Sequence, residues 1–205
     1  MTDARNDIVR TAKSFVLLKS LGGKLRMHWA EVRPMPLTTK FPIITDCSGE
    51  FTLNFWIAGA NDPNKRRFDG YGNTVTLFNA GLHLDISQVV PGDAVIYGPG
   101  GEWHVGTVVE VHGHDILTVS HGQEGDPSYV WVNPPKTVPH RGYPSDGRMP
   151  QTYVRFPTRR ISPLREMWHA VAKKVAPKAS PGPQPPHPPT GYQRPGPAPA
   201  GGVQP

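Results

Sequence analysis

The sequence predicts a single α+β domain followed by a proline-rich tail. Apolar residues recur at helical spacing near the N-terminus and again after Cys47. From about residue 91 the pattern changes to short strand-like runs separated by glycine-containing turns, which indicates an antiparallel meander. Helices followed by consecutive strands are typical of the α+β class, and 205 residues allow one domain with appendages.

Two helices are expected ahead of the strands. The apolar spacing of the first predicts a helix over 4–20. A connector that contains three prolines precedes the second, which is expected to start at Cys47 because Asp46 or Thr45 can accept hydrogen bonds from its open N–H groups. The polar, glycine-containing stretch 59–75 is interpreted as a surface loop.

Five strands are expected in the second half of the domain, and the second and third should form a hairpin over a turn at 112–115. A turn with two or four loop residues would place Gly106 opposite His121, with His104 on the same face. A three-residue turn would place the two histidines on opposite faces. The predicted strands are 94–97, 104–111, 116–121, 129–132 and 152–156.

The positive charge is concentrated at the C-terminal end. Residues 155–205 hold eight basic side chains and one acidic one, a net charge of +7, whereas the other 154 residues sum to −1. This asymmetry predicts an anionic surface or polymer as a partner of the tail, but not nucleic acid, because the basic run contains almost no aromatic residues. A basic amphipathic helix is expected within 158–176, and 177–205, with 11 prolines among 29 residues, is expected to be disordered.

The only cysteine, Cys47, is a candidate nucleophile, although a lone cysteine is also compatible with a small buried hydrophobe. Unpaired N–H groups at a helix start favour a thiolate, so the position predicts a lowered pKa for the Cys47 thiol. His104 would act as general base and then as general acid, while His121 would orient the His104 ring. The backbone N–H of Cys47 is expected to donate to the oxyanion.

Several motifs resemble those of the NlpC-type cysteine peptidases, which belong to the papain-like class. They are Asp46-Cys47-Ser48-Gly49, Pro91-Gly92-Asp93-Ala94-Val95, His104-Val105-Gly106 and the later His121. The runs Gly59-Ala60-Asn61-Asp62-Pro63-Asn64 and Ser120-His121-Gly122-Gln123-Glu124 are similar to those of small peptidases encoded by phages of actinobacteria. The resemblance covers about residues 25–157, after an N-terminal helical segment at 1–24.

The resemblance implies a papain-like fold, in which the cysteine helix packs on an antiparallel sheet of five or six strands. It implies hydrolysis of peptidoglycan stem peptides, typically at a D-glutamyl–diamino acid bond, and no cofactor is expected. Through its basic tail, the chain would then bind anionic wall polymer or a membrane surface. One departure concerns the oxyanion site. Members often have a tyrosine upstream of the cysteine, whereas here no tyrosine precedes Tyr71, and His28 or Trp29 lies in the corresponding region.

Two other functions stay open. The related CHAP class shares the Cys–His order and would cut the sugar–peptide amide or a cross-bridge amide. His121 favours the NlpC type, because the third residue of the CHAP class is usually acidic or Asn. The non-enzymatic alternative is a virion or wall-binding protein with a degenerate peptidase fold, although Cys47, His104 and His121 are all intact.

No metal site is expected from the sequence. The run that contains His112, His114 and Asp115, together with His121, could supply zinc ligands but is more typical of a polar hairpin turn. The acidic and amide residues of the surface loop, namely Asp62, Asn64, Asp69 and Asn73, do not follow the spacing of an EF-hand.

The N-terminus lacks the basic-then-apolar order of a secretory signal, so synthesis in a host cytoplasm is expected. Action at the cell wall would then follow release through a holin, as for an endolysin, or delivery within a virion.

Overall fold

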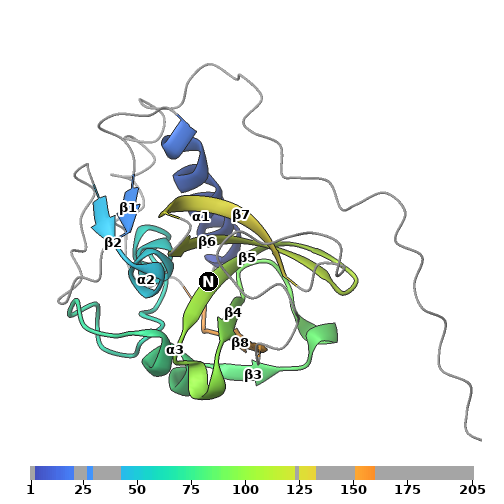
Figure 1. The fold of residues 1–205 in the computed structure, drawn as a ribbon. Helices are drawn as coiled ribbons and strands as arrows, with labels where there is room; N and C mark the ends of the chain where they lie inside the picture. The colour runs from blue at the N-terminus through green and yellow to red at the C-terminus, as the bar shows by residue number, and fades with distance from the viewer. Residues whose placement is uncertain (1–2, 21–26, 30–42, 123–124, 133–150, 160–205) are drawn as a thin grey trace, which may run out of the picture.

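The fold is that of a computed structural model, which describes residues 3–20, 27–29, 43–122, 125–132 and 151–159 (Figure 1). Six antiparallel strands form one sheet in the order β3-β8-β4-β5-β6-β7, and β1 and β2 form a separate parallel pair. This arrangement confirms the α+β class and the six-stranded antiparallel sheet. The helices are α1 (Arg5–Ser20), α2 (Cys47–Ile57) and α3 (Thr74–Ala80), and the strands are β1 (Met27–Trp29), β2 (Ile43–Thr45), β3 (Leu82–Leu84), β4 (Ala94–Tyr97), β5 (His104–His112), β6 (Asp115–Gly122), β7 (Gly125–Val132) and β8 (Gln151–Arg155).

Both predicted helices and all five predicted strands are present, with ends shifted by a few residues. Two elements that the sequence pattern does not predict, α3 and the short strand β3, lie between the surface loop and β4. Elements of three or seven residues contain too few turns or alternations to give a periodic signal. Most of the predicted helix at 158–176 and the whole of 177–205 lie outside the described residues.

Helices α1 and α2 lie side by side and cover one face of the sheet (Figure 1). In the core, Phe51 and Phe55 of α2 pack with Phe156, with ring centroids 5.1 to 5.8 Å apart. All but three of the 11 residues of α2 are buried, so this helix is enclosed on nearly every side. The opposite face carries a second apolar cluster, which includes Val89, Val95, Val108, Ile116 and Tyr153.

The start of α2 is fixed by a side-chain cap. Asp46 has an extended backbone, and its carboxylate accepts hydrogen bonds from the Gly49 N–H (2.8 Å) and the Ser48 hydroxyl (2.9 Å). Of the two predicted caps, Asp46 therefore holds the position, as expected for a carboxylate facing open N–H groups. Cys47 is consequently the first residue of the helix.

The predicted surface loop after α2 is organised around Asp62, whose carboxylate accepts backbone N–H groups of Asn64, Arg66 and Phe68 at 2.7 to 2.9 Å. Lys65, Arg67 and Phe68 have positive φ, a conformation that side chains rarely adopt. The Asp62 hydrogen bonds hold the backbone in this shape. Asn64 then joins the loop to its neighbours, since it donates to Thr52 of α2 and accepts from Thr76 of α3.

The β5–β6 hairpin departs from its predicted pairing. Its turn has two loop residues, as one prediction allowed, and His112 pairs with Asp115. The register then shifts between Val108 and Glu110, because β5 contains one extra residue there. Beyond this bulge Gly106 lies opposite Ser120, so the prediction that it would face His121 is wrong.

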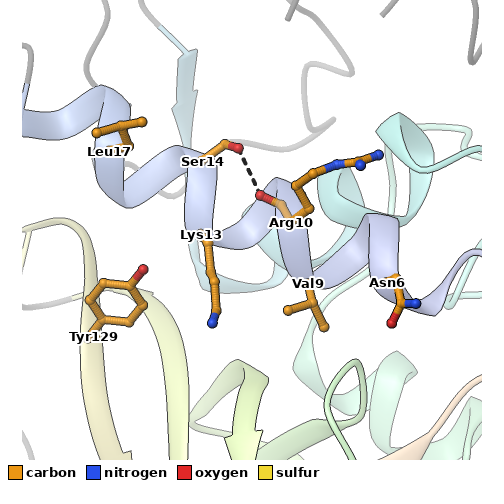
Figure 2. Close-up of a pocket in the computed structure, with 7 residues that line it drawn as sticks. All are labelled: Asn6, Val9, Arg10, Lys13, Ser14, Leu17 and Tyr129. Atoms are coloured by element: carbon orange, nitrogen blue, oxygen red, sulfur yellow. Dashed lines mark hydrogen bonds between the residues drawn. The ribbon is translucent and has the colours of Figure 1, made fainter. Parts of the chain in front are cut away.

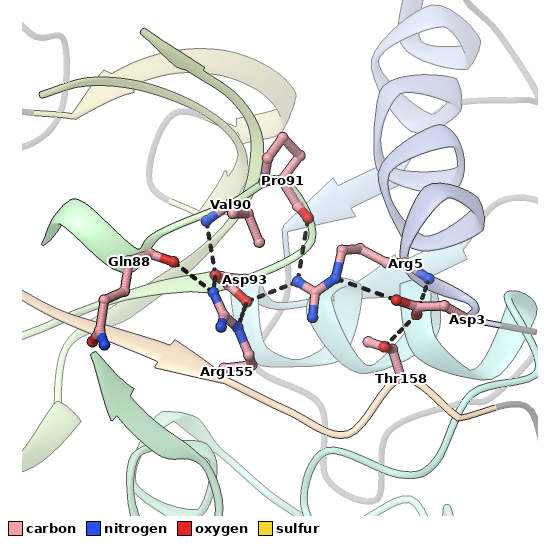
Figure 3. Close-up of polar contacts among 8 residues, drawn as sticks. All are labelled: Asp3, Arg5, Gln88, Val90, Pro91, Asp93, Arg155 and Thr158. Carbon is pink, nitrogen blue, oxygen red and sulfur yellow. Dashed lines mark hydrogen bonds and ion pairs between the residues drawn. The ribbon is translucent and has the colours of Figure 1, made fainter. Parts of the chain in front are cut away.

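A buried carboxylate joins the N-terminal helix to the sheet (Figure 3). Asp93 is fully buried and accepts hydrogen bonds from Arg5 (2.9 Å) and from two nitrogens of Arg155 (2.8 and 2.9 Å). It also accepts the Val90 N–H at 2.9 Å. Asp3 hydrogen bonds to Thr158 beside this cluster and brings both ends of the described domain together.

We expect Asp93→Ala to lower the free energy of unfolding by roughly 2–4 kcal/mol, because it leaves two partly buried guanidinium groups without their shared acceptor. Urea unfolding followed by circular dichroism measures this loss. Asp69→Ala is the matched control, since Asp69 pairs with Arg66 at an exposed site and its removal should change the unfolding midpoint little. Equal losses of stability for the two variants would contradict the role of Asp93 as a buried acceptor that joins α1 to the sheet.

Candidate active site

The thiol of Cys47 lies at the first turn of α2 and against the start of β5. The backbone N–H groups of Val105 and Ser48 lie close enough to the sulfur to favour its thiolate form. Val105 directly follows His104, so the only thiol of the chain contacts the residue next to the candidate base. The side chain is partly exposed and packs against the core cluster that contains Phe51.

Burial, with a smaller effect of the charge of Asp46, raises the pKa of the Cys47 thiol to about 12. The N–H groups of Val105 and Ser48 act in the opposite direction but do not compensate. The predicted lowering of this pKa is therefore wrong. The carboxylate that caps the helix offsets the favourable effect of the helix start, and desolvation then disfavours the thiolate.

His104 is the first residue of β5, and only 2% of it is exposed. Its Nε2 lies 2.5 Å from the hydroxyl of Ser120, and its ring packs beside Tyr97 at 5.8 Å between centroids. Burial, with a smaller effect of His121, lowers the pKa of His104 to about 3. The imidazole is therefore neutral at pH 7 and can accept a proton.

His121, on β6, is fully buried and contacts the segment that leads into α2. Its Nε2 donates to the carbonyl oxygen of Thr45 at 3.0 Å, two residues before Cys47. Successive side chains of a strand face opposite ways, so His121 points away from the face on which Ser120 lies. The structure thus places Val105, next to His104, beside Cys47, and His121 at the Thr45 carbonyl, whereas the Nε2 of His104 lies at Ser120.

Glu50 lies one turn after Cys47 and is 1% exposed. It accepts a hydrogen bond from Asn54 (2.9 Å), which also donates to Thr107 of β5 (3.1 Å). Burial raises the pKa of Glu50 to about 8. A single sequence gives no sign of this, since Glu50 occupies a helical position where an acidic residue is normally solvated.

The segment expected to support the oxyanion from upstream of Cys47 is described only by its backbone. The backbone of His28 and Trp29 belongs to β1, which pairs with β2 directly before Asp46, so this segment does lie near the helix start. The side chains of these two residues fall outside the described part. Trp103, which precedes His104, is 50% exposed and lies over Gly98, at the open end of β5.

A cavity of about 380 Å³ lies between α1 and β7, and Figure 2 shows its lining. Val9, Leu17 and Tyr129 supply apolar walls. Two basic residues at its rim are already engaged, since Arg10 pairs with Asp7 and Lys13 pairs with Glu110. None of Cys47, His104 and His121 lines this cavity.

Within the described ranges, no group of three or more His, Cys, Asp or Glu side chains is placed to hold a metal ion. His112 is exposed and lies 3.4 Å from Glu110. No helix in this part of the chain is long and apolar enough to cross a membrane.

No protein-family model matches the chain, and no curated protein matches its sequence. Among solved structures, the peptidoglycan hydrolase RipB of Mycobacterium tuberculosis is 21% identical, over 75% of this chain and 65% of that one, with a TM-score of 0.42. The P60 domain of an M. avium subspecies paratuberculosis antigen is 21% identical, over 72% and 96%, with a TM-score of 0.37. RipD of M. tuberculosis, described as a non-catalytic NlpC/p60 domain protein adapted to peptidoglycan binding, is 16% identical, over 76% and 98%, with a TM-score of 0.41. The match thus spans just under two thirds of RipB, and a hydrolase and a non-catalytic protein both resemble the chain.

We predict that the Cys47 thiol reacts slowly with iodoacetamide at pH 8. With a pKa of about 12, against 9.0 for an ordinary thiol, the thiolate is roughly a thousandfold scarcer in the folded chain than in the unfolded one. Because the chain has one cysteine, mass spectrometry reports its alkylation without ambiguity. Equal alkylation rates with and without denaturing urea would contradict the raised pKa.

We also predict that Glu50 lowers the free energy of unfolding as the pH rises. Its pKa is about 8 when folded and near 4.5 when unfolded, so the folded form keeps a proton that the unfolded form has released. The contribution is fully present below pH 4.5 and is lost progressively as the pH rises toward 8.

Glu50→Gln removes this titration and keeps an acceptor for Asn54. Its free energy of unfolding should exceed that of the natural chain by an amount that grows between pH 5 and pH 8. Glu102→Gln, at an exposed position, should run parallel to the natural chain. A Glu50→Gln difference that is constant with pH would exclude the assignment.

Proposed function

We propose that this chain is a cysteine peptidase that cuts stem-peptide amide bonds of bacterial peptidoglycan. The observation that carries the proposal is the position of its only thiol, at the first residue of α2 and in contact with the Val105 N–H next to His104. A nucleophile at a helix start and a neutral histidine at an adjacent strand start are the parts that acyl transfer requires. The choice of peptidoglycan rests on the resemblance of the Cys47, His104 and His121 motifs to NlpC-type peptidases.

In the proposed reaction, the Cys47 sulfur attacks the carbonyl carbon of the scissile amide while its proton passes to His104. The backbone N–H of Cys47 donates to the oxyanion that forms. The C–N bond then breaks, and His104 returns the proton to the leaving amine. Water, deprotonated by His104, hydrolyses the thioester and restores the thiol. Since the Cys47 thiol and the His104 imidazole are both neutral before the reaction, the proton is transferred during the attack and not before it.

The high pKa of the Cys47 thiol favours a second candidate, a wall-binding protein without activity. A neutral, desolvated thiol is a weak nucleophile unless the substrate or His104 removes its proton. An amidase of the CHAP type, which would cut the sugar–peptide or cross-bridge amide, uses the same chemistry on another bond. Either enzyme, the peptidase or the amidase, could act as a phage endolysin or as a virion-borne lysin. In both roles the basic tail would tether the chain to anionic wall polymer or membrane.

Digestion of purified peptidoglycan, with mass analysis of the soluble products, tests the proposal. We expect free stem-peptide fragments from the natural chain and none from Cys47→Ala or Cys47→Ser. His104→Ala should lose about 10²- to 10⁴-fold in rate, the usual contribution of a general base. His112→Ala, an exposed histidine, is the matched control and should keep full activity.

The products separate the candidates. Release of complete stem peptides from intact glycan would identify an amidase, and an active Cys47→Ala would exclude the thiol mechanism. Binding to peptidoglycan without soluble products, in the natural chain and in Cys47→Ala alike, would identify a binding protein.

A further inference from the structure

We infer that Ser120, and not His121, is the residue that positions the ring of His104. The inference rests on the proposed peptidase function and assigns a further residue to it. Ser120 hydroxyl lies 2.5 Å from Nε2 of His104, and both residues are almost fully buried. A buried imidazole nitrogen with one close polar partner is held in orientation by that partner.

The strand register explains why the hydroxyl reaches this ring. The bulge in β5 places Ser120 opposite Gly106, and His104 precedes Gly106 by two residues on the same face. Gly106 has no side chain that would stand between His104 and Ser120. A Cβ atom at position 106 would lie only 3.2 Å from the Thr118 side chain, so the two strands are closely packed at this point. Ser120 is thus the diagonal neighbour of His104 across the two strands.

His121 has a different partner on the other side of the sheet. Its Nε2–H is directed at the Thr45 carbonyl, which ends β2 immediately before the Asp46 cap. This contact fixes where the chain enters α2. His121 therefore positions the nucleophile through the backbone, while Ser120 positions the base.

The assignment also decides which nitrogen of His104 takes the proton. When the Ser120 oxygen accepts a hydrogen bond from the ring, Nε2 carries the hydrogen of the neutral imidazole and Nδ1 carries none. In the proposed reaction Nδ1 is then the basic nitrogen, which takes up the thiol proton and later gives it to the leaving amine. In the imidazolium that forms, Nε2–H remains bonded to Ser120, which stabilises the positive charge.

The test compares Ser120→Ala, Ser120→Thr and His121→Asn by their rates on soluble muropeptide across pH. Ser120→Ala should lower kcat about ten- to hundredfold with little change in KM, and should move the acid limb of the pH profile to lower pH because the imidazolium loses its acceptor. Ser120→Thr keeps the hydroxyl and should restore the acid limb. In His121→Asn the acid limb should stay in place, whatever the change in rate.

Nitrogen-15 NMR of histidine-labelled protein gives a second readout that does not depend on activity. The natural chain and Cys47→Ala should both show a protonated Nε2 on His104, protected from exchange, and Ser120→Ala should lose this protection while the other folded signals persist. An unchanged rate and unchanged protection in Ser120→Ala would overturn the inference, as would an acid limb that moves in His121→Asn and not in Ser120→Ala. If Cys47→Ala or His104→Ala were active, the proposed peptidase function would fail instead, and the NMR result would still report whether Ser120 holds the ring.

Discussion

The structure depends on one buried carboxylate. Asp93 accepts hydrogen bonds from Arg5 and Arg155, which lie 88 and 62 positions away in the sequence. A charge that has lost its hydration is tolerated only with such partners, so the start of α1, the turn before β4 and the strand β8 must assemble together. With α1 fixed in this way, α2 is enclosed between α1 and the sheet, and the position of Cys47 follows from that enclosure.

A second constraint is the polar side of α2. Thr52 and Asn54 are buried, and they connect the helix to Asn64 of the surface loop and to Thr107 of β5. An apolar helix face can rotate or slide with little cost, whereas hydrogen bonds of fixed direction select one orientation. We attribute to these contacts the fixed rotation of α2, which directs its first residue toward the start of β5. The same burial explains why Glu50 retains a proton at neutral pH.

Local features were predictable from the sequence and long-range ones were not. The start of α2 follows from Asp46, and the strands β4 to β6 follow from alternation and turn residues, because each signal lies within a few positions. The pKa of Cys47 depends on desolvation by residues from other elements, so its helix position alone gave the wrong direction. The contact of His104 with Ser120 was missed for a related reason, since no residue type marks the bulge that shifts β5 against β6.

The extra residue in β5 has a consequence for how this site can vary between proteins. On the two sides of the bulge the pairing differs by one residue, so the presence or absence of the bulge decides which of two adjacent side chains lies diagonal to His104. If the register of the turn continued through β5 without the bulge, Gly106 would lie opposite His121, and the imidazole of His121 would take the place of the Ser120 hydroxyl. The hydrogen-bonding group next to the base can thus be exchanged by a change of register alone, with every amino acid left as it is.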